Sequence, residues 1–148
     1  MKPKAPVTDL AAKLRFLMDF QPIDQSQSYT IGELASHLKV SLRTLRFYEQ
    51  AGLLLPSREG LRRLYSPQDL ERLEVIVTLR ALEVSLTSIK SLLTLVDTGG
   101  PGSAERITET IDQIFDELSR SNLARIGELE TINRRIGVAR ETFANPNA

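Results

Sequence analysis

Two signals for the start of a helix follow each other closely near residue 30, and their spacing constrains the fold more than any other feature. In the first, TIGE, Thr30 and Glu33 can form a capping box. In the second, Ser41 is a preferred N-cap residue, and Gly52 can end the helix in a left-handed conformation. Only a short helix and a tight turn fit between them. The sequence therefore predicts a helix-turn-helix, with residues 41–51 in the recognition position.

Both predicted helices are amphipathic. The first carries apolar residues at helical spacing: Ile31, Leu34, Ala35 and Leu38. In the second, SLRTLRFYEQAGLL, the side chains of Arg43, Arg46 and Phe47 cluster on one side at about 100° per residue, and Leu42 and Leu45 face away from them. Such a helix can be an ordinary solvated helix, so its role depends on the rest of the chain.

The stretch LLLPSREGLRRLYS follows the recognition helix and is divided by Pro56 and Gly60. It predicts a small hairpin with three arginines and a tyrosine, in the position of a wing. Ser66 at the N-cap, Pro67 and Asp69 then start a helix that we expect to extend to about Leu82. The core stripe expected for it consists of Leu70, Leu73, Val77 and Leu82.

Ser85 is expected to cap a further helix, LTSIKSLLTLV, and TGGPG then interrupts the chain. A long helix is predicted from Ser103 to about Thr142. Its apolar residues repeat in steps of four and three, a heptad pattern that becomes polar at Asn122 and Arg125. An antiparallel coiled-coil dimer is the preferred interpretation, and packing of the helix onto its own domain is the alternative. The expected seam consists of Ile107, Ile111, Ile114, Leu118, Leu129, Ile132 and Ile136.

The first 28 residues are weakly patterned. Thr8 is expected to cap a short helix that ends before Pro22, and DQSQS is typical of a polar linker. Lys13, Arg15 and Asp19 interrupt the apolar residues, which argues against a signal peptide or a membrane span. We therefore expect a cytoplasmic protein without a membrane partner.

The net charge is zero, but the charges are unevenly distributed. Residues 41–65 contain five arginines and two glutamates, an excess of 5 − 2 = +3. Residues 97–148 contain six basic and nine acidic residues, an excess of 6 − 9 = −3. A basic segment followed by an acidic one is expected if only the first contacts phosphate.

The sequence contains no cysteine and one histidine, His37. This composition argues against a thiolate metal site, and we expect neither a metal nor a cofactor. We interpret His37 as a surface residue of the first helix. No nucleophile–base arrangement or glycine-rich phosphate loop is evident, so the sequence does not indicate an enzyme.

Residues 29–95 resemble the MerR family of transcription regulators. The resemblance is carried by YTIGELASHLKVSLRTLRFYEQAGLL, Arg58 with Gly60, RLYS, DLERL and SLTSIKSLL, which occur in the family's order. It implies a mainly α fold: a winged helix-turn-helix domain followed by a long coiled-coil dimerisation helix. The corresponding division is an N-terminal extension over 1–28, partly flexible or a short helix, a DNA-binding domain over 29–96 and a dimerisation helix over 103–143.

The resemblance also implies a homodimer that binds a near-palindromic promoter element in double-stranded DNA. Many relatives distort such an element so that RNA polymerase can engage it, which makes RNA polymerase an expected partner. By position, the recognition helix supplies Ser41, Arg43, Thr44, Arg46, Phe47 and Tyr48, and the wing supplies Arg58, Arg62, Arg63 and Tyr65. Guanidinium groups suit guanine edges and phosphates, whereas wing residues more often position a protein on the backbone.

Three alternatives stay open. Tyr48 and Tyr65 can equally serve to pack the wing against the recognition helix. The family's sensing region follows the long helix, where this sequence has only ETFANPNA, so no inducer is named. The chain can also be an architectural DNA-binding protein, or a protein-interaction adaptor without DNA affinity.

Overall fold

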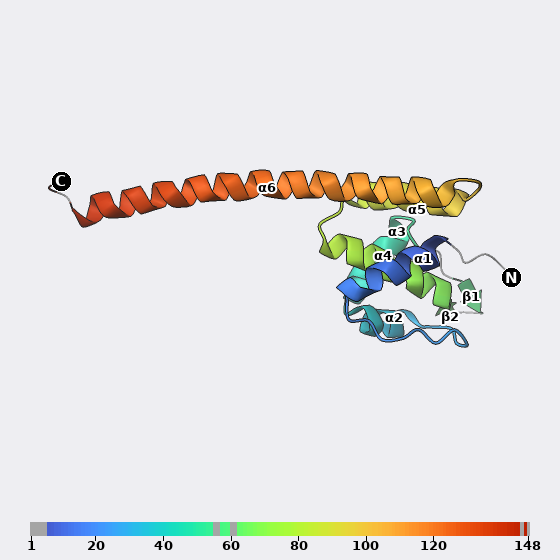
Figure 1. Cartoon of the computed structure of the whole chain (residues 1–148). Helices are drawn as coiled ribbons and strands as arrows, with labels where there is room; N and C mark the ends of the chain where they lie inside the picture. The colour runs from blue at the N-terminus through green and yellow to red at the C-terminus, as the bar shows by residue number, and fades with distance from the viewer. Residues whose placement is uncertain (1–5, 55–56, 60–61, 146, 148) are drawn as a thin grey trace. The chain divides into compact units, whose positions relative to one another are not determined.

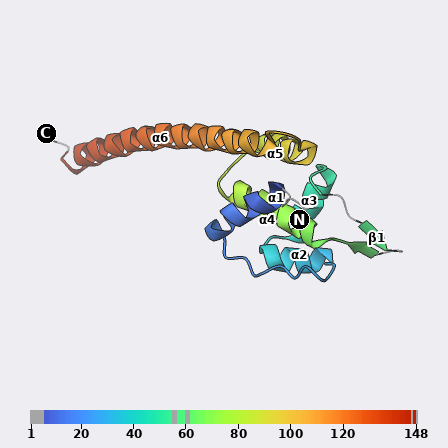
Figure 2. The same cartoon turned by 45° about the vertical axis from the view of Figure 1, so that its right-hand side comes forward.

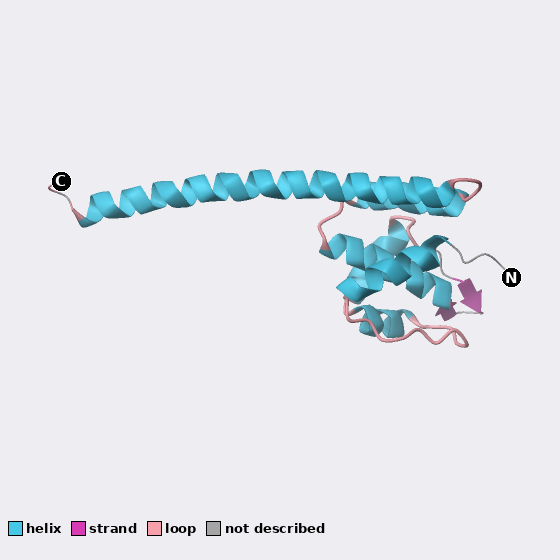
Figure 3. Ribbon diagram, in the orientation of Figure 1, coloured by secondary structure: helices cyan, strands magenta, loops and turns pink. Residues whose placement is uncertain are grey.

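A computed structural model describes residues 6–54, 57–59, 62–145 and 147. The chain divides into two compact units, Met1–Thr108 and Glu109–Ala148. The first unit is mainly helical and contains one small hairpin, drawn in magenta in Figure 3. The second unit consists largely of the continuation of one long helix, α6 (Ser103–Ala144), which begins in the first unit.

Helix α4 (Pro67–Ala81) lies at the centre of the first unit. A continuous run of its residues, 73–79, is buried, so this helix is covered all round rather than along one stripe. Ser66 and Asp69 form the predicted capping box at its start, with Pro67 in the first turn. Leu82, expected in the core stripe, follows the helix and is partly exposed, so that expectation was wrong.

The helix-turn-helix is formed by α2 (Ile31–Leu38) and α3 (Leu42–Gln50), which lie below and beside α4 in Figures 1 and 2. Thr30 and Glu33 form the predicted capping box, and Ser41 caps α3 as expected. Lys39 takes a left-handed conformation (φ 55°) at the end of α2, which allows the tight turn.

The predicted wing is an antiparallel hairpin of β1 (Ser57–Glu59) and β2 (Arg62–Leu64), in which Arg58 pairs with Arg63. Pro56, Gly60 and Leu61, around which the hairpin was predicted, lie outside the described residues. Tyr65 follows β2 and exchanges two backbone hydrogen bonds of 2.8 Å with Tyr29. This bridge ties the end of the wing to the segment that leads into α2.

Helix α5 (Leu86–Thr98) is capped by Ser85, as predicted, and Gly99, Gly100 and Gly102 take positive φ angles after it. These conformations suit glycine and separate α5 from α6. Among the described residues, none of the helices is both long enough and apolar enough to cross a bilayer.

The N-terminal extension forms a helix, α1 (Pro6–Leu14), and a short 3-10 turn, η1 (Arg15–Leu17). Thr8 lies inside α1 and is not its cap, because its hydroxyl donates a 2.8 Å hydrogen bond to Glu71 of α4. Leu10, Ala11 and Leu14 are buried, and α1 packs against α4. The extension is therefore part of the core of the first unit.

Candidate nucleic-acid interface

Helix α3 is anchored by one face and leaves the other open. Its N-terminus is fixed by Ser41, whose hydroxyl accepts a 3.1 Å hydrogen bond from the Thr44 amide. Leu45 and Tyr48 are buried on its inner face. After the helix, Gly52 takes a φ of 77°, as the sequence predicted, and Leu53 returns to the core.

The open face of α3 carries the predicted arginines. Arg43 and Arg46 are exposed, and among the described residues neither guanidinium has a hydrogen bond or an ion pair. Phe47 is 49% exposed, with its ring centroid 6.1 Å from that of Tyr48. Leu42, expected to face away from the arginines, lies in the first turn and is also partly exposed. An uncompensated pair of guanidinium groups on a helix face can bind an anion without first breaking an internal ion pair.

The wing brings a second set of arginines to the surface. Arg62 and Arg63 of β2 are exposed, whereas the side chain of Arg58 lies outside the described structure. Arg63 donates from Nη1 to Glu49 Oε2 over 3.1 Å, which links the wing to α3. Arg62 has no such contact within the described part of the chain.

Tyr48 and Tyr65 are both in the core, which favours packing as their role. The Tyr65 hydroxyl donates a hydrogen bond to Glu49, so Glu49 contacts both Tyr65 and Arg63. Burial, this hydrogen bond and the negative charge of Glu49 all raise the pKa of Tyr65 above its usual value. Burial also raises the pKa of Tyr48, more than the nearby Arg80 lowers it. Both hydroxyls are therefore protonated at neutral pH.

Glu49 was not singled out from the sequence, although it joins the recognition helix to the wing. Its two partners are distant in the chain, and neither spacing nor residue type indicates the pairing. The only available signal was that Glu49 is the single acidic residue of α3, which also carries two arginines.

The interpretation of His37 as a surface residue was wrong. Its side chain is only 11% exposed, and Nε2 lies 2.8 Å from Oε1 of the buried Glu74. The other oxygen of Glu74 accepts a 2.8 Å hydrogen bond from Arg15 Nη2, and the ring of Phe20 stacks on His37. This network explains how the Glu74 carboxylate is accommodated in the core: each of its two oxygens has a hydrogen-bond partner.

The second unit presents an apolar row along α6. Leu129, Ile132 and Ile136 are each about half exposed, and Phe143 follows Ile136 one heptad later. Ile111, Ile114 and Leu118 are partly covered. Ile107 is buried in the first unit. This member of the predicted seam therefore packs onto its own domain, as the alternative interpretation expects.

The comparisons with known proteins assign the family. Residues 29–95 match the model of the MerR HTH family regulatory proteins. The HTH-type transcriptional regulator ZntR homolog of Haemophilus influenzae is 36% identical over 113 residues, which are 75% of this chain and 80% of that protein. The chain belongs to the MerR family of transcriptional regulators. Its relatives are regulators and not enzymes, so this MerR-family chain is not an enzyme.

Other relatives agree with this assignment. ZntR of Escherichia coli K12 is 33% identical over 73% of this chain and 75% of its own length. The structure of PbrR691 from Ralstonia metallidurans in complex with lead(II) has a TM-score of 0.63 at 30% identity, covering 77% of this chain and 86% of that one. HiNmlR, a MerR-family regulator lacking the sensor domain and bound to promoter DNA, has the same fold, with a TM-score of 0.53 at 24% identity over 80% and 90%.

The residues of this MerR-family chain do not fit a soft metal ion such as the lead(II) in PbrR691. Such ions favour thiolate ligands, and the sequence has no cysteine. Within the described ranges, no three histidine, aspartate or glutamate side chains are grouped so that they could hold a metal.

Proposed function

We propose that this regulator binds a near-palindromic promoter element as a homodimer, with α3 of each protomer in the major groove. The observation that carries the proposal is the open face of α3, where Arg43 and Arg46 have no partner in the described structure and Phe47 lies beside them. Arginine donates two parallel hydrogen bonds to a guanine edge, and an apolar side chain suits a thymine methyl group.

The wing is proposed to position the protein on the sugar–phosphate backbone. Arg62 has no ion pair among the described residues, while Arg63 already shares its charge with Glu49. We expect Arg62 to contribute more than Arg63 to phosphate binding, because Arg63 can bind a phosphate only by sharing or breaking its ion pair with Glu49. Tyr65 and Glu49 act here as the brace that holds the wing beside α3.

Dimerisation is proposed to use the apolar row of α6 in an antiparallel coiled coil. Half-exposed aliphatic side chains at heptad spacing are stabilised when a second helix covers them. A two-fold dimer then matches a palindrome, since each protomer presents the same reading helix to one half-site. We accordingly propose residues 29–96 as the DNA-binding domain and 103–143 as the dimerisation helix.

Distortion of the promoter, contact with RNA polymerase and a cytoplasmic location are further parts of the proposal. HiNmlR, which has the same fold, is bound to promoter DNA in its crystal structure, and this supports a promoter as the target. Bending a short DNA site costs on the order of 1–6 kcal/mol, which a dimer with two reading helices and two wings can offset through added contacts.

Selection of bound duplexes from a random pool tests the proposal. The expected outcome is enrichment of a near-palindromic site, protected on both half-sites in footprinting and bent when donor and acceptor dyes are placed at its ends. A pool without any enriched sequence would contradict sequence-specific binding and would leave the adaptor interpretation. Enrichment of a single half-site would contradict the dimer.

A further inference from the structure

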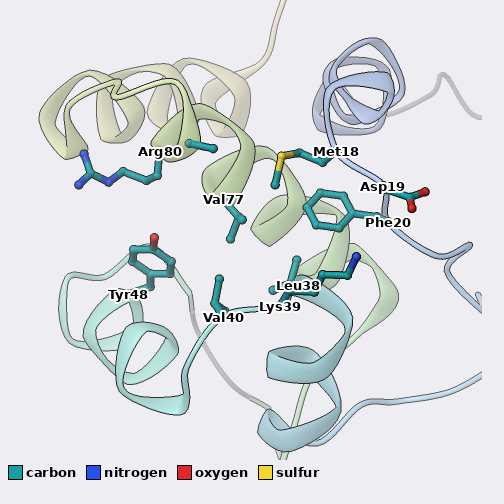
Figure 4. Close-up of a pocket in the computed structure, with 10 residues that line it drawn as sticks. Met18, Asp19, Phe20, Leu38, Lys39, Val40, Tyr48, Val77 and Arg80 are labelled. Carbon is teal, nitrogen blue, oxygen red and sulfur yellow. The ribbon is translucent and has the colours of Figure 1, made fainter.

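A cavity of about 460 Å³ lies inside the first unit, between the N-terminal extension and the helix-turn-helix (Figure 4). The extension contributes residues 18–20, the end of α2 and the turn after it contribute residues 38–40, and α3 contributes Tyr48. Helix α4 closes it with Val77, Arg80 and Ala81. Its size is within the range of pockets that hold small organic molecules.

The middle of the cavity is apolar. Its walls include Met18, Phe20, Val40 and Val77, and Figure 4 shows these side chains converging from three different segments. A phenyl ring or a branched alkyl group would therefore be removed from water on several sides. This burial is favourable in proportion to the apolar area covered.

One end of the cavity is polar and positively charged. Arg80 donates from Nη1 to the Val84 carbonyl over 2.9 Å, and the Tyr48 side chain lines the cavity with it. The carbonyl acceptor is neutral, so this contact does not cancel the charge of the guanidinium, which has five N–H donors. Among the lining residues, Lys39 adds a second positive charge against the single carboxylate of Asp19.

We propose that this cavity binds a small organic anion with one carboxylate on an aromatic or branched apolar body. The carboxylate lies against Arg80 and the Tyr48 hydroxyl, and the apolar body occupies the space between Phe20, Val40 and Val77. A polyphosphate fits less well, because most of the wall is apolar and would leave its oxygens without donors.

The position of the cavity links it to the DNA-reading helix. Tyr48 lies on the inner face of α3, opposite the arginines. Residues 38–40 lie at the end of α2 and in the turn after it, which determines the orientation of α3 relative to α2. A ligand here contacts the elements that present Arg43 and Arg46.

An NMR titration of the full-length protein with phenylacetate tests the proposal without DNA, so its outcome is independent of the proposed function. Phenylacetamide is the neutral control ligand. We expect saturable shifts at the amides of Val40, Val77 and Ala81, with an affinity in the region of about 1 mM for so small a probe, and weaker binding of the amide.

Three variants assign the binding to the cavity. Arg80→Gln removes the charge and should weaken phenylacetate binding by about fivefold or more. Ala81→Phe fills the cavity from an exposed position and should abolish the shifts, while Lys90→Gln, which removes a charge from α5, should change nothing. Absence of saturable shifts up to about 10 mM, equal affinity for the amide, or an unchanged affinity in folded Ala81→Phe would overturn the proposal.

Discussion

The apolar row of α6 provides the most quantitative prediction. Ile132 and Ile136 are 51% and 53% exposed in the single chain. Complete burial of such a side chain is worth about 1.5–3 kcal/mol, so covering the exposed half contributes about 0.8–1.5 kcal/mol. With two residues in each of two protomers, the gain is about 3–6 kcal/mol. Changing both residues to Glu should therefore raise the dimer dissociation constant by about 100- to 20,000-fold, because each 1.4 kcal/mol is roughly tenfold.

Sedimentation equilibrium measures this constant directly. The matched control changes Leu123 and Val138 to Glu, since both are exposed apolar residues of the same helix. At about 100° per residue they lie on the side opposite Leu129, Ile132 and Ile136. The control adds the same charge but should leave dimerisation nearly unchanged. Equal weakening in both variants, or a dimer constant unaffected by the change at Ile132 and Ile136, would refute the assignment of the seam.

Three further changes test the packing of the first unit and the absence of a metal. Glu74→Ala should lower the free energy of unfolding by about 1–3 kcal/mol in urea titrations, since Arg15 and His37 lose the carboxylate that accepts their hydrogen bonds but can bind water instead. Tyr65→Phe should cost about 1 kcal/mol at pH 7. Because the pKa of Tyr65 is raised in the folded state, its hydroxyl contributes fully to the free energy of unfolding below about pH 10 and loses this contribution at higher pH. As the pH rises above about 10, Tyr65→Phe should therefore lose less stability than the unmodified protein. Dialysis against EDTA should leave DNA affinity unchanged, because the sequence has no cysteine to hold a soft metal; a fall in affinity that zinc restores would contradict this.

Local signals in the sequence predicted most of the helices. Four N-cap hydroxyls accept hydrogen bonds from backbone amides three residues further along, namely those of Thr30, Ser41, Ser66 and Ser85. Each cap can therefore be predicted from a few consecutive residues of the sequence. Leu82 was misplaced because α4 ends one residue before it, and the other failures involve contacts between segments far apart in the chain. Thr8 has the residue type of a cap, but its hydroxyl is bonded to α4.

The same reason explains what was missed in the candidate site. The exposed arginines of α3 follow from helical periodicity, whereas the brace formed by Glu49 depends on where the wing folds back. His37 has a polar neighbourhood in the sequence, and only the buried Glu74 and the stacked Phe20 give it a core position. The cavity likewise exists only because the extension closes over the turn between α2 and α3.

Competition between selected and random duplexes tests most directly whether α3 reads sequence. Arg46→Ala and Arg43→Ala should each lower the affinity for the selected palindrome by about 1–3 kcal/mol per half-site and change the affinity for random DNA much less. Arg62→Ala, the control from the wing, should weaken both duplexes equally and reduce the salt dependence by about one unit per protomer. If loss of Arg43 or Arg46 weakens selected and random DNA by the same factor, α3 binds phosphate rather than bases, and the assignment of α3 as the reading helix is contradicted.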